Sequence, residues 1–321
     1  MTNQVMATAK NDPPTLWQLP WLLARFLPYY LRHLAFQPYR GSRWLDNARE
    51  LVRVSSRRHK IAVYDAVLEL LLKGYAELAG HPLHPQTGRV AVMLTRIGFA
   101  FDDEYERRQA MNEPRELMDL LGSPVVDETI QDWRKFMQEF DTYVSIREFL
   151  MVFVADLYAK YTENAANISR SADADAVLEG AILDSGGLLV TLAHVVAKFH
   201  AVEPADDLLK QFSSLGVNGK LADDIIDFRA DFTGGRPNML RVLATKDEQE
   251  LRKAVGSVSS RRPMSVRWWR RNCPYTYRLL VNLYREHQGN LSSAWLRYTS
   301  SLLWAPALLG HARRADTRGR I

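Results

Sequence analysis

Apolar residues recur every three or four positions along most of the chain, which is the period of amphipathic helices. Alternating β-branched runs, which would indicate strands, are scarce. The pattern predicts helices over the following ranges: 16–36, 47–79, 90–108, 116–121, 128–161, 174–183, 188–200, 204–231, 266–286 and 292–309. Asp184-Ser185-Gly186-Gly187 divides two of them. We therefore expect an all-α protein, a single helical bundle around a central active-site cavity.

No repeat, long linker or shift in composition divides the chain. The expected organisation is a disordered N-terminus over 1–15, one helical domain over 16–310, and a basic disordered tail over 311–321. Nearly half of the 321 residues are apolar, which is enough to build a large core.

Charge and cysteine content narrow the class of protein. The net charge of +5 is concentrated in the tail and between Arg261 and Arg271, without a nucleic-acid motif, so we expect no nucleic-acid partner. That basic segment could equally line an anionic substrate site. Cys273 is the single cysteine, so an intrachain disulfide is impossible.

The apolar segment 16–36 contains two arginines and two prolines. We expect it to pack on the core rather than to span a membrane, with a membrane-surface helix as the alternative. No secretion signal precedes it, so the expected location is cytoplasmic, without stable membrane insertion.

The first acidic cluster is Asp102-Asp103-Glu104-Tyr105-Glu106, at the end of an apolar helix. Asp102 and Glu106 share a helix face, and Asp103 pairs with Glu106 at a spacing of three. Like charges at these spacings destabilise a helix unless a cation offsets them. Magnesium, which prefers oxygen ligands, is a natural counter-charge, and a solvated charged face is the alternative.

The second cluster is a stripe of Asp223, Asp227 and Asp231, each four residues from the next. Such spacing places three carboxylates along about 12 Å of one helix face. A solvated face is again the alternative. Two carboxylate walls on separate helices could together hold magnesium against one diphosphate, and the metal would neutralise charge as the carbon–oxygen bond breaks.

These residues resemble the class I terpene synthase family of the isoprenoid synthase superfamily, bacterial type. Asp102, Asp103 and Glu106 match its aspartate-rich motif in the DDxxE form, and the stripe has the spacing of its second metal motif. Arg297-Tyr298 is similar to the family's diphosphate-binding pair. The helix interruption at 184–187 also resembles that of the family.

The resemblance implies a lyase of diterpene or other isoprenoid biosynthesis that uses Mg²⁺, with three ions expected alongside the substrate diphosphate. The expected substrate is a small isoprenyl diphosphate, C20 favoured and C15 open, including a bicyclic labdane type supplied by a class II diterpene cyclase. A homodimer is a further possible partner state. Aromatic residues that could line the pocket are Phe99, Phe101, Phe199 and Trp295, although each could equally be ordinary core.

Two departures keep an alternative open. Asp227 stands where cyclases usually carry Ser or Thr, which resembles chain-elongating prenyl diphosphate synthases. No arginine stands shortly before Gly186, where the family has its diphosphate sensor. Chain elongation is the first alternative, although the chain lacks an evident second basic pocket, and a non-enzymatic helical interaction module is the second.

Overall fold

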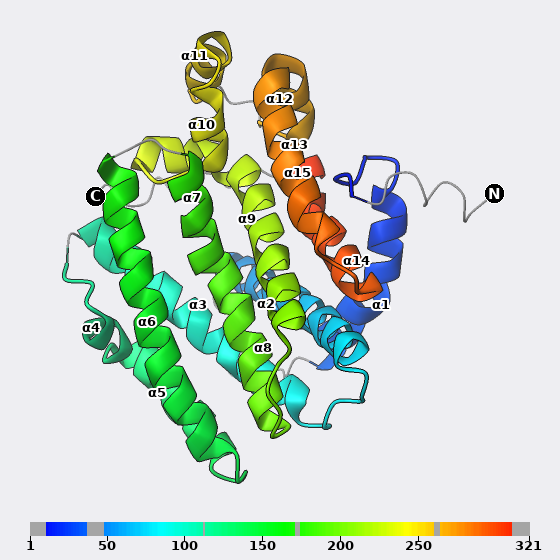
Figure 1. The fold of residues 1–321 in the computed structure, drawn as a ribbon, viewed down its shortest axis with the longest axis vertical. Coiled ribbons are helices and arrows are strands. Elements are labelled where there is room, and N and C mark those ends of the chain that lie inside the picture. The colour runs from blue at the N-terminus through cyan, green and yellow to red at the C-terminus, as the bar shows by residue number, and fades with distance from the viewer. Residues whose placement is uncertain (1–10, 37–47, 112, 171–173, 260–263, 310–321) are drawn as a thin grey trace.

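The computed structural model describes residues 11–36, 48–111, 113–170, 174–259 and 264–309 (Figure 1). Regular structure in these ranges is helical, and no strand occurs within them. The helices are α1 (Leu19–Phe36), α2 (Ala48–Ala79), α3 (Thr87–Met111), α4 (Leu117–Leu121), α5 (Pro124–Met137), α6 (Tyr143–Arg170), α7 (Ala174–Ala181), the π-helical turn η1 (Ile182–Gly186), α8 (Gly187–Phe199), α9 (Asp206–Gly234), α10 (Met239–Ala244), α11 (Glu248–Ser257), α12 (Val266–Asn272), α13 (Pro274–Gly289), α14 (Ala294–Leu303) and α15 (Ala305–Leu309). The predicted all-α class is confirmed. The predicted disordered ends, 1–15 and 311–321, lie largely or wholly outside the described residues.

Helix α9 runs through the middle of the bundle (Figure 1). It contacts η1 and α8 on one side and α13 and α14 on another. Contacts of α2 with α3, α3 with α8, and α14 with both α9 and α2 close a ring of helices. This ring is the frame that holds both acidic clusters.

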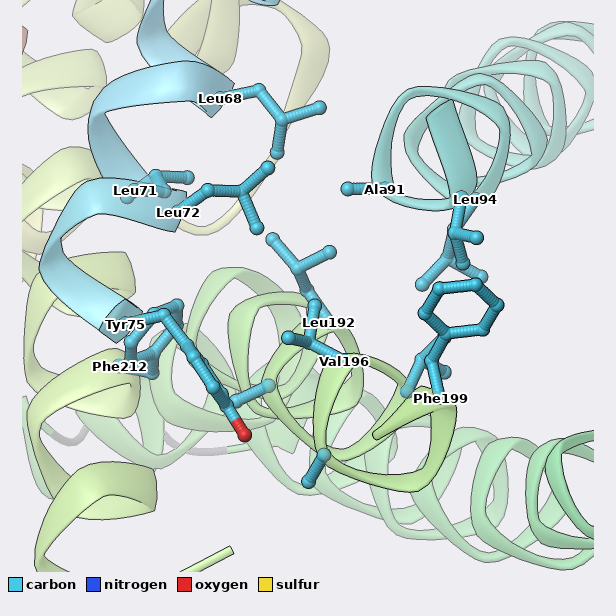
Figure 2. Close-up of a cluster of buried hydrophobic side chains, with 14 of the residues drawn as sticks. Leu68, Leu71, Leu72, Tyr75, Ala91, Leu94, Leu192, Val196, Phe199 and Phe212 are labelled. Carbon is cyan, nitrogen blue, oxygen red and sulfur yellow. The ribbon is translucent and has the colours of Figure 1, made fainter. Parts of the chain in front are cut away.

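A continuous apolar cluster fills one end of the ring (Figure 2). Helix α2 contributes Leu68, Leu71, Leu72 and Tyr75, whose spacing of three and four places them on one helix face. They meet Leu192 and Val196 of α8 and Phe212 of α9, shown in Figure 2. Burial of these side chains fixes the positions of α2, α3, α8 and α9 relative to one another.

Several of the sequence-based helix ranges need correction. The predicted helix 128–161 is two helices, α5 and α6, separated at residues 138–142. Phe140 lies in that connection and packs on Phe136 and Phe199, with ring centroids 5.2 and 5.0 Å away. The non-local contact with Phe199 anchors this connection, where no Gly or Pro marks a break. The predicted helix 266–286 is also two helices, α12 and α13, and Pro274 begins the second. Helices α10 and α11 were not predicted.

The expected interruption at 184–187 is a π-helical turn, η1, joining α7 and α8 without a gap. Single π turns within helices are rare and frequently mark functional sites. Residues Ala174–Phe199 together form a helical segment of 26 residues that is long and apolar enough to cross a membrane. However, 56% of its apolar window is buried inside this fold, and the core helix of a soluble protein meets the same criterion.

Candidate active site

The first acidic wall lies near the C-terminal end of α3. Asp102 and Asp103 are exposed there. Glu104, the next residue, forms ion pairs within α3 instead. Its carboxylate lies 2.8 Å from Arg107 and 2.7 Å from Arg108. Hydrogen bonds from Arg107 and then Arg108 lower the pKa of Glu104 to about 2. The helix therefore neutralises Glu104 locally and leaves the aspartate pair as the accessible carboxylates; the Glu106 side chain lies outside the described atoms.

The second wall, on α9, is less uniform than its spacing predicts. The Asp223 side chain is 42% exposed, whereas Asp227 and Asp231 are buried. Asp231 accepts a hydrogen bond from Asn238 Nδ2 at 2.9 Å and pairs with Arg236 Nε at 3.1 Å. The predicted stripe is therefore open to solvent at its N-terminal end and bonded to protein groups at its C-terminal end.

Asp224, the neighbour of Asp223, points into the protein. It accepts the Met239 backbone N–H at 2.7 Å and pairs with Lys220 Nζ at 3.1 Å. Burial raises the pKa of Asp224 to about 6, although Lys220 and the Met239 N–H act in the opposite direction. Asn238 also donates from Nδ2 to the Asp224 carbonyl at 3.0 Å. Asn238 and Met239, which follow α9 in the chain, are therefore hydrogen-bonded to Asp224 and Asp231 of that helix.

Lys220 links this wall to η1. Its ammonium lies 3.1 Å from Asp224 and 4.0 Å from Asp223. The charge of Asp224, followed by those of Asp223 and Asp184, raises the pKa of Lys220 despite its burial. Burial raises the pKa of Asp184 in η1. The charge of Lys220 opposes this shift, and the charge of Asp223 adds to it. These carboxylates therefore favour the charged form of the Lys220 ammonium.

The two walls approach each other around Tyr161 of α6. Burial raises the pKa of the Tyr161 hydroxyl, and the charges of Asp184 and Asp102 raise it further. Lys220 acts on the same hydroxyl in the opposite direction. The Tyr161 ring also lies 6.3 Å from that of Tyr105 on α3. Tyr161 is therefore within electrostatic reach of Asp102 on α3, Asp184 in η1 and Lys220 on α9.

The predicted Arg297–Tyr298 pair occupies the α1–α2 side of α14. Arg297 Nη1 donates to the Leu291 carbonyl at 3.1 Å, and Tyr298 donates its hydroxyl to the Leu22 carbonyl at 2.8 Å. The guanidinium of Arg25 lies 4.7 Å from the Tyr298 ring centroid. In this conformation the structure does not bring the pair together with the acidic walls, and its role in diphosphate binding stays a prediction.

The four predicted pocket aromatics lie in different surroundings. Phe99 packs on Tyr64 with ring centroids 4.6 Å apart, and Phe101 packs on Tyr158 at 5.8 Å, both near the α3 wall. Phe199 belongs to the buried core cluster, and Trp295 lies beneath Arg25 near α1. Only the first two are placed to border a substrate at the acidic clusters.

A pocket of about 400 Å³ lies between α1, α2 and α3. It is lined by His33, Asp65, Leu68, Glu69, Leu72, Gly88, Arg89, Val92, Met93 and Arg96. None of the predicted site residues lines it. It is therefore separate from the constellation around Tyr161.

Within the described residues, no three His, Cys, Asp or Glu side chains converge closely enough to hold a metal ion by themselves. Magnesium nevertheless fits the donor chemistry of the two walls, because it commonly takes one or two protein carboxylates and completes its shell with phosphate and water oxygens. Asp102, Asp103 and Asp223 offer exposed or partly exposed carboxylates for that purpose.

Three contributors to this region were not singled out from the sequence: Tyr161, Asp184 and Lys220. Asp184 stands in the recognised helix interruption, and Lys220 stands one turn before Asp224, so both carried a local signal. Tyr161 carried none, since its role follows from how α6 packs beside η1.

Searches for similar proteins give little further guidance. No family model matches the chain, and no curated protein matches it. Among solved structures, a polyprenyl synthase from Roseobacter denitrificans matches over 94% of both chains with 16% sequence identity and a TM-score of 0.41. At these values neither an activity nor a substrate can be carried over.

Proposed function

We propose that this chain is a magnesium-dependent class I terpene synthase that ionises an isoprenyl diphosphate, with C20 favoured, and directs the resulting carbocation to cyclised, rearranged or eliminated products. The observation that carries the proposal is the position of Tyr161: its ring lies 6.3 Å from that of Tyr105 in the α3 cluster, and its helix α6 contacts η1, which packs on α9. It supports the hypothesis that the two acidic clusters, which are 121 positions apart from Asp102 to Asp223, act on one ligand.

In this proposal Asp102 and Asp103 on α3, with Asp223 and Asp227 on α9, are the residues that would hold magnesium. When bound, the metal supplies the positive charge that a departing diphosphate requires. Asp231 would contribute only after exchanging its bonds to Asn238 and Arg236.

Lys220 supplies a positive charge in a chain that has no arginine within a few residues before Gly186. Its ammonium already lies beside Asp223 and faces η1, so it is placed to donate to a diphosphate oxygen at the same position. The paired rings of Phe99 and Tyr64 would border the hydrocarbon and exclude water from the cation.

Chain elongation remains the second candidate, because the Asp223-Asp224-x-x-Asp227 arrangement favours it. It differs from cyclisation in requiring a second diphosphate substrate. The two can therefore be separated by the substrate requirement of the reaction.

The test is incubation of the full chain with Mg²⁺ and, separately, C10, C15, C20 and bicyclic C20 diphosphates, each with and without isopentenyl diphosphate. A terpene synthase forms a hydrocarbon or alcohol from one of them without the second substrate. Asp102→Ala and Asp103→Ala should abolish that product while the protein stays folded. Longer diphosphates formed only with isopentenyl diphosphate would establish elongation instead, and product formation by both variants would remove the α3 wall from the site.

A further inference from the structure

Helix α1 packs on the bundle with one face and leaves the other apolar. Leu19, Leu22 and Phe26 are buried against α2 and α14, as expected for a first helix that covers the core. The outward positions of the helix are also apolar and exposed: Pro20, Trp21, Leu23, Ala24, Leu27, Pro28 and Leu31. Leu16 and Trp17, in the turn that precedes α1, are exposed as well. At 100° per residue these positions cover a continuous arc of about 160°.

This surface is unlike scattered apolar exposure, which is normal on proteins. Trp17 is 94% exposed, and Leu27 and Leu31 are about half exposed. No charged residue interrupts the outward arc. A continuous apolar face of this kind indicates a binding surface.

The charged residues of α1 itself have one sign. From Leu16 to Phe36 the sequence contains no Asp or Glu, but it contains Arg25 and Arg32. Within α1, Arg25 and Arg32 lie on the border between the outward arc and the side facing the bundle. Arg32 remains half exposed while its guanidinium pairs with Glu69.

A spanning orientation does not suit this helix. With 18 residues it is shorter than the roughly 20 needed to cross the hydrocarbon core. Its inner face is also held by the bundle, because the Leu22 carbonyl accepts the Tyr298 hydroxyl. The helix can therefore meet a surface without leaving the protein.

We propose that the outer face of α1 docks the protein on an anionic lipid surface. The leucines enter the boundary between head groups and acyl chains, the tryptophans lie at that interface, and the arginines meet anionic head groups. Apolar burial and charge attraction act together, which is how interfacial helices bind reversibly. This inference does not depend on the proposed enzymatic activity.

The experiment is co-sedimentation of the full chain with vesicles of phosphatidylcholine, alone or with about one third phosphatidylglycerol. We expect binding to the anionic vesicles that weakens as salt is added, and little binding to the neutral ones. Leu27→Glu with Leu31→Glu should weaken partitioning by about tenfold or more, because both side chains face outward and the added charges oppose insertion.

The matched control is Met151→Glu with Val152→Glu on α6. It adds the same charge to two side chains that are more exposed than those of α1, on a helix that carries Glu148 and Asp156. This control should bind vesicles like the unmodified protein. Thermal unfolding and circular dichroism establish that both double variants are folded.

Equal loss of binding in both double variants, equal binding to neutral and anionic vesicles, or no binding by the unmodified protein would each overturn the proposal. A lipid-free dimer that Leu27→Glu with Leu31→Glu dissociates would assign the face to a second copy of the chain instead.

Discussion

Asp223 and Asp224 are adjacent, yet their carboxylates have different surroundings. Asp223 remains 42% exposed beside Lys220, whereas Asp224 is buried and bonded to the Met239 N–H. Adjacent residues on a helix are separated by about 100°, so only one of the pair can face the region around Tyr161. Asp227 and Asp231 are both buried, and Asp231 is bonded to Arg236 and Asn238.

Asp227 provides the sharpest test at the residue scale. If its carboxylate is a magnesium ligand, Asp227→Ser should keep substantial turnover because the hydroxyl still offers an oxygen. Asp227→Leu should lose about a hundredfold or more, because it offers no oxygen where charge must be stabilised. Steady-state turnover of both variants checks this, with thermal unfolding as the control for folding. Equal activities in the two variants would contradict the ligand role.

At the scale of elements, the contact between η1 and α9 determines where the π turn lies. Gly216 of α9 has no room for a side chain, since an added Cβ would lie 2.3 Å from the Ser185 carbonyl oxygen. The missing side chain of Gly216 leaves space on the helix face that precedes the acidic stripe. In the fold that space is filled by the backbone of η1, which brings Asp184 close to Lys220 and Asp223.

Gly216→Ala should therefore destabilise the protein by about 1–3 kcal/mol, because backbone atoms must shift to admit the methyl group. Gly256→Ala in α11 is the matched control. No atom lies within 4 Å of its added Cβ, so higher helix propensity should stabilise the protein by up to about 1 kcal/mol. Denaturant unfolding of both variants measures the two effects, and equal unfolding free energies would contradict close η1–α9 packing.

A second contact between elements joins the end of α2 to the start of α14. Glu77 accepts the Ser293 hydroxyl at 2.7 Å and the backbone N–H groups of Ala294 and Trp295 at 3.3 and 3.4 Å. Burial alone would raise the pKa of Glu77, but these bonds and the charge of Arg297 outweigh it and lower the pKa. The carboxylate thus stabilises the N-terminus of α14.

Glu77→Gln should cost about 0.5–1 kcal/mol near neutral pH, where the native carboxylate is charged but solvent screens this exposed side chain. Because the pKa is lower in the folded than in the unfolded state, the stabilisation is present above the ordinary value of 4.5. It disappears as pH falls through the folded-state pKa, so the two proteins should converge in stability under acid. Chemical denaturation at several pH values checks this; a difference independent of pH would indicate a steric cause.

At the scale of the whole molecule, the ring formed by α2, α3, α8, α9 and α14 brings distant clusters together. Its apolar end is filled by the cluster in Figure 2, so the carboxylates gather toward the other end. Since no closed metal site exists among the described side chains, metal and diphosphate should bind jointly.

Mg²⁺ with pyrophosphate should therefore raise Tm by about 5 °C or more near saturation, because both ligands favour the folded state. Either one alone should have a much smaller effect. Thermal unfolding with each combination measures this, and Asp102→Ala with Asp223→Ala serves as the unresponsive control. Equal stabilisation by pyrophosphate alone would indicate a basic anion site instead.

The sequence by itself determined the helical class, most helix ranges and the two acidic clusters, because periodicity and residue spacing are local properties. Tertiary structure decided what those residues face. Only packing could show that η1 contacts both α6 and α9, that Tyr298 faces α1, and that Phe140 packs on Phe199 between α5 and α6. Burial and charge pairing depend on neighbours far along the chain, so the partner of each side chain follows from the assembled helices.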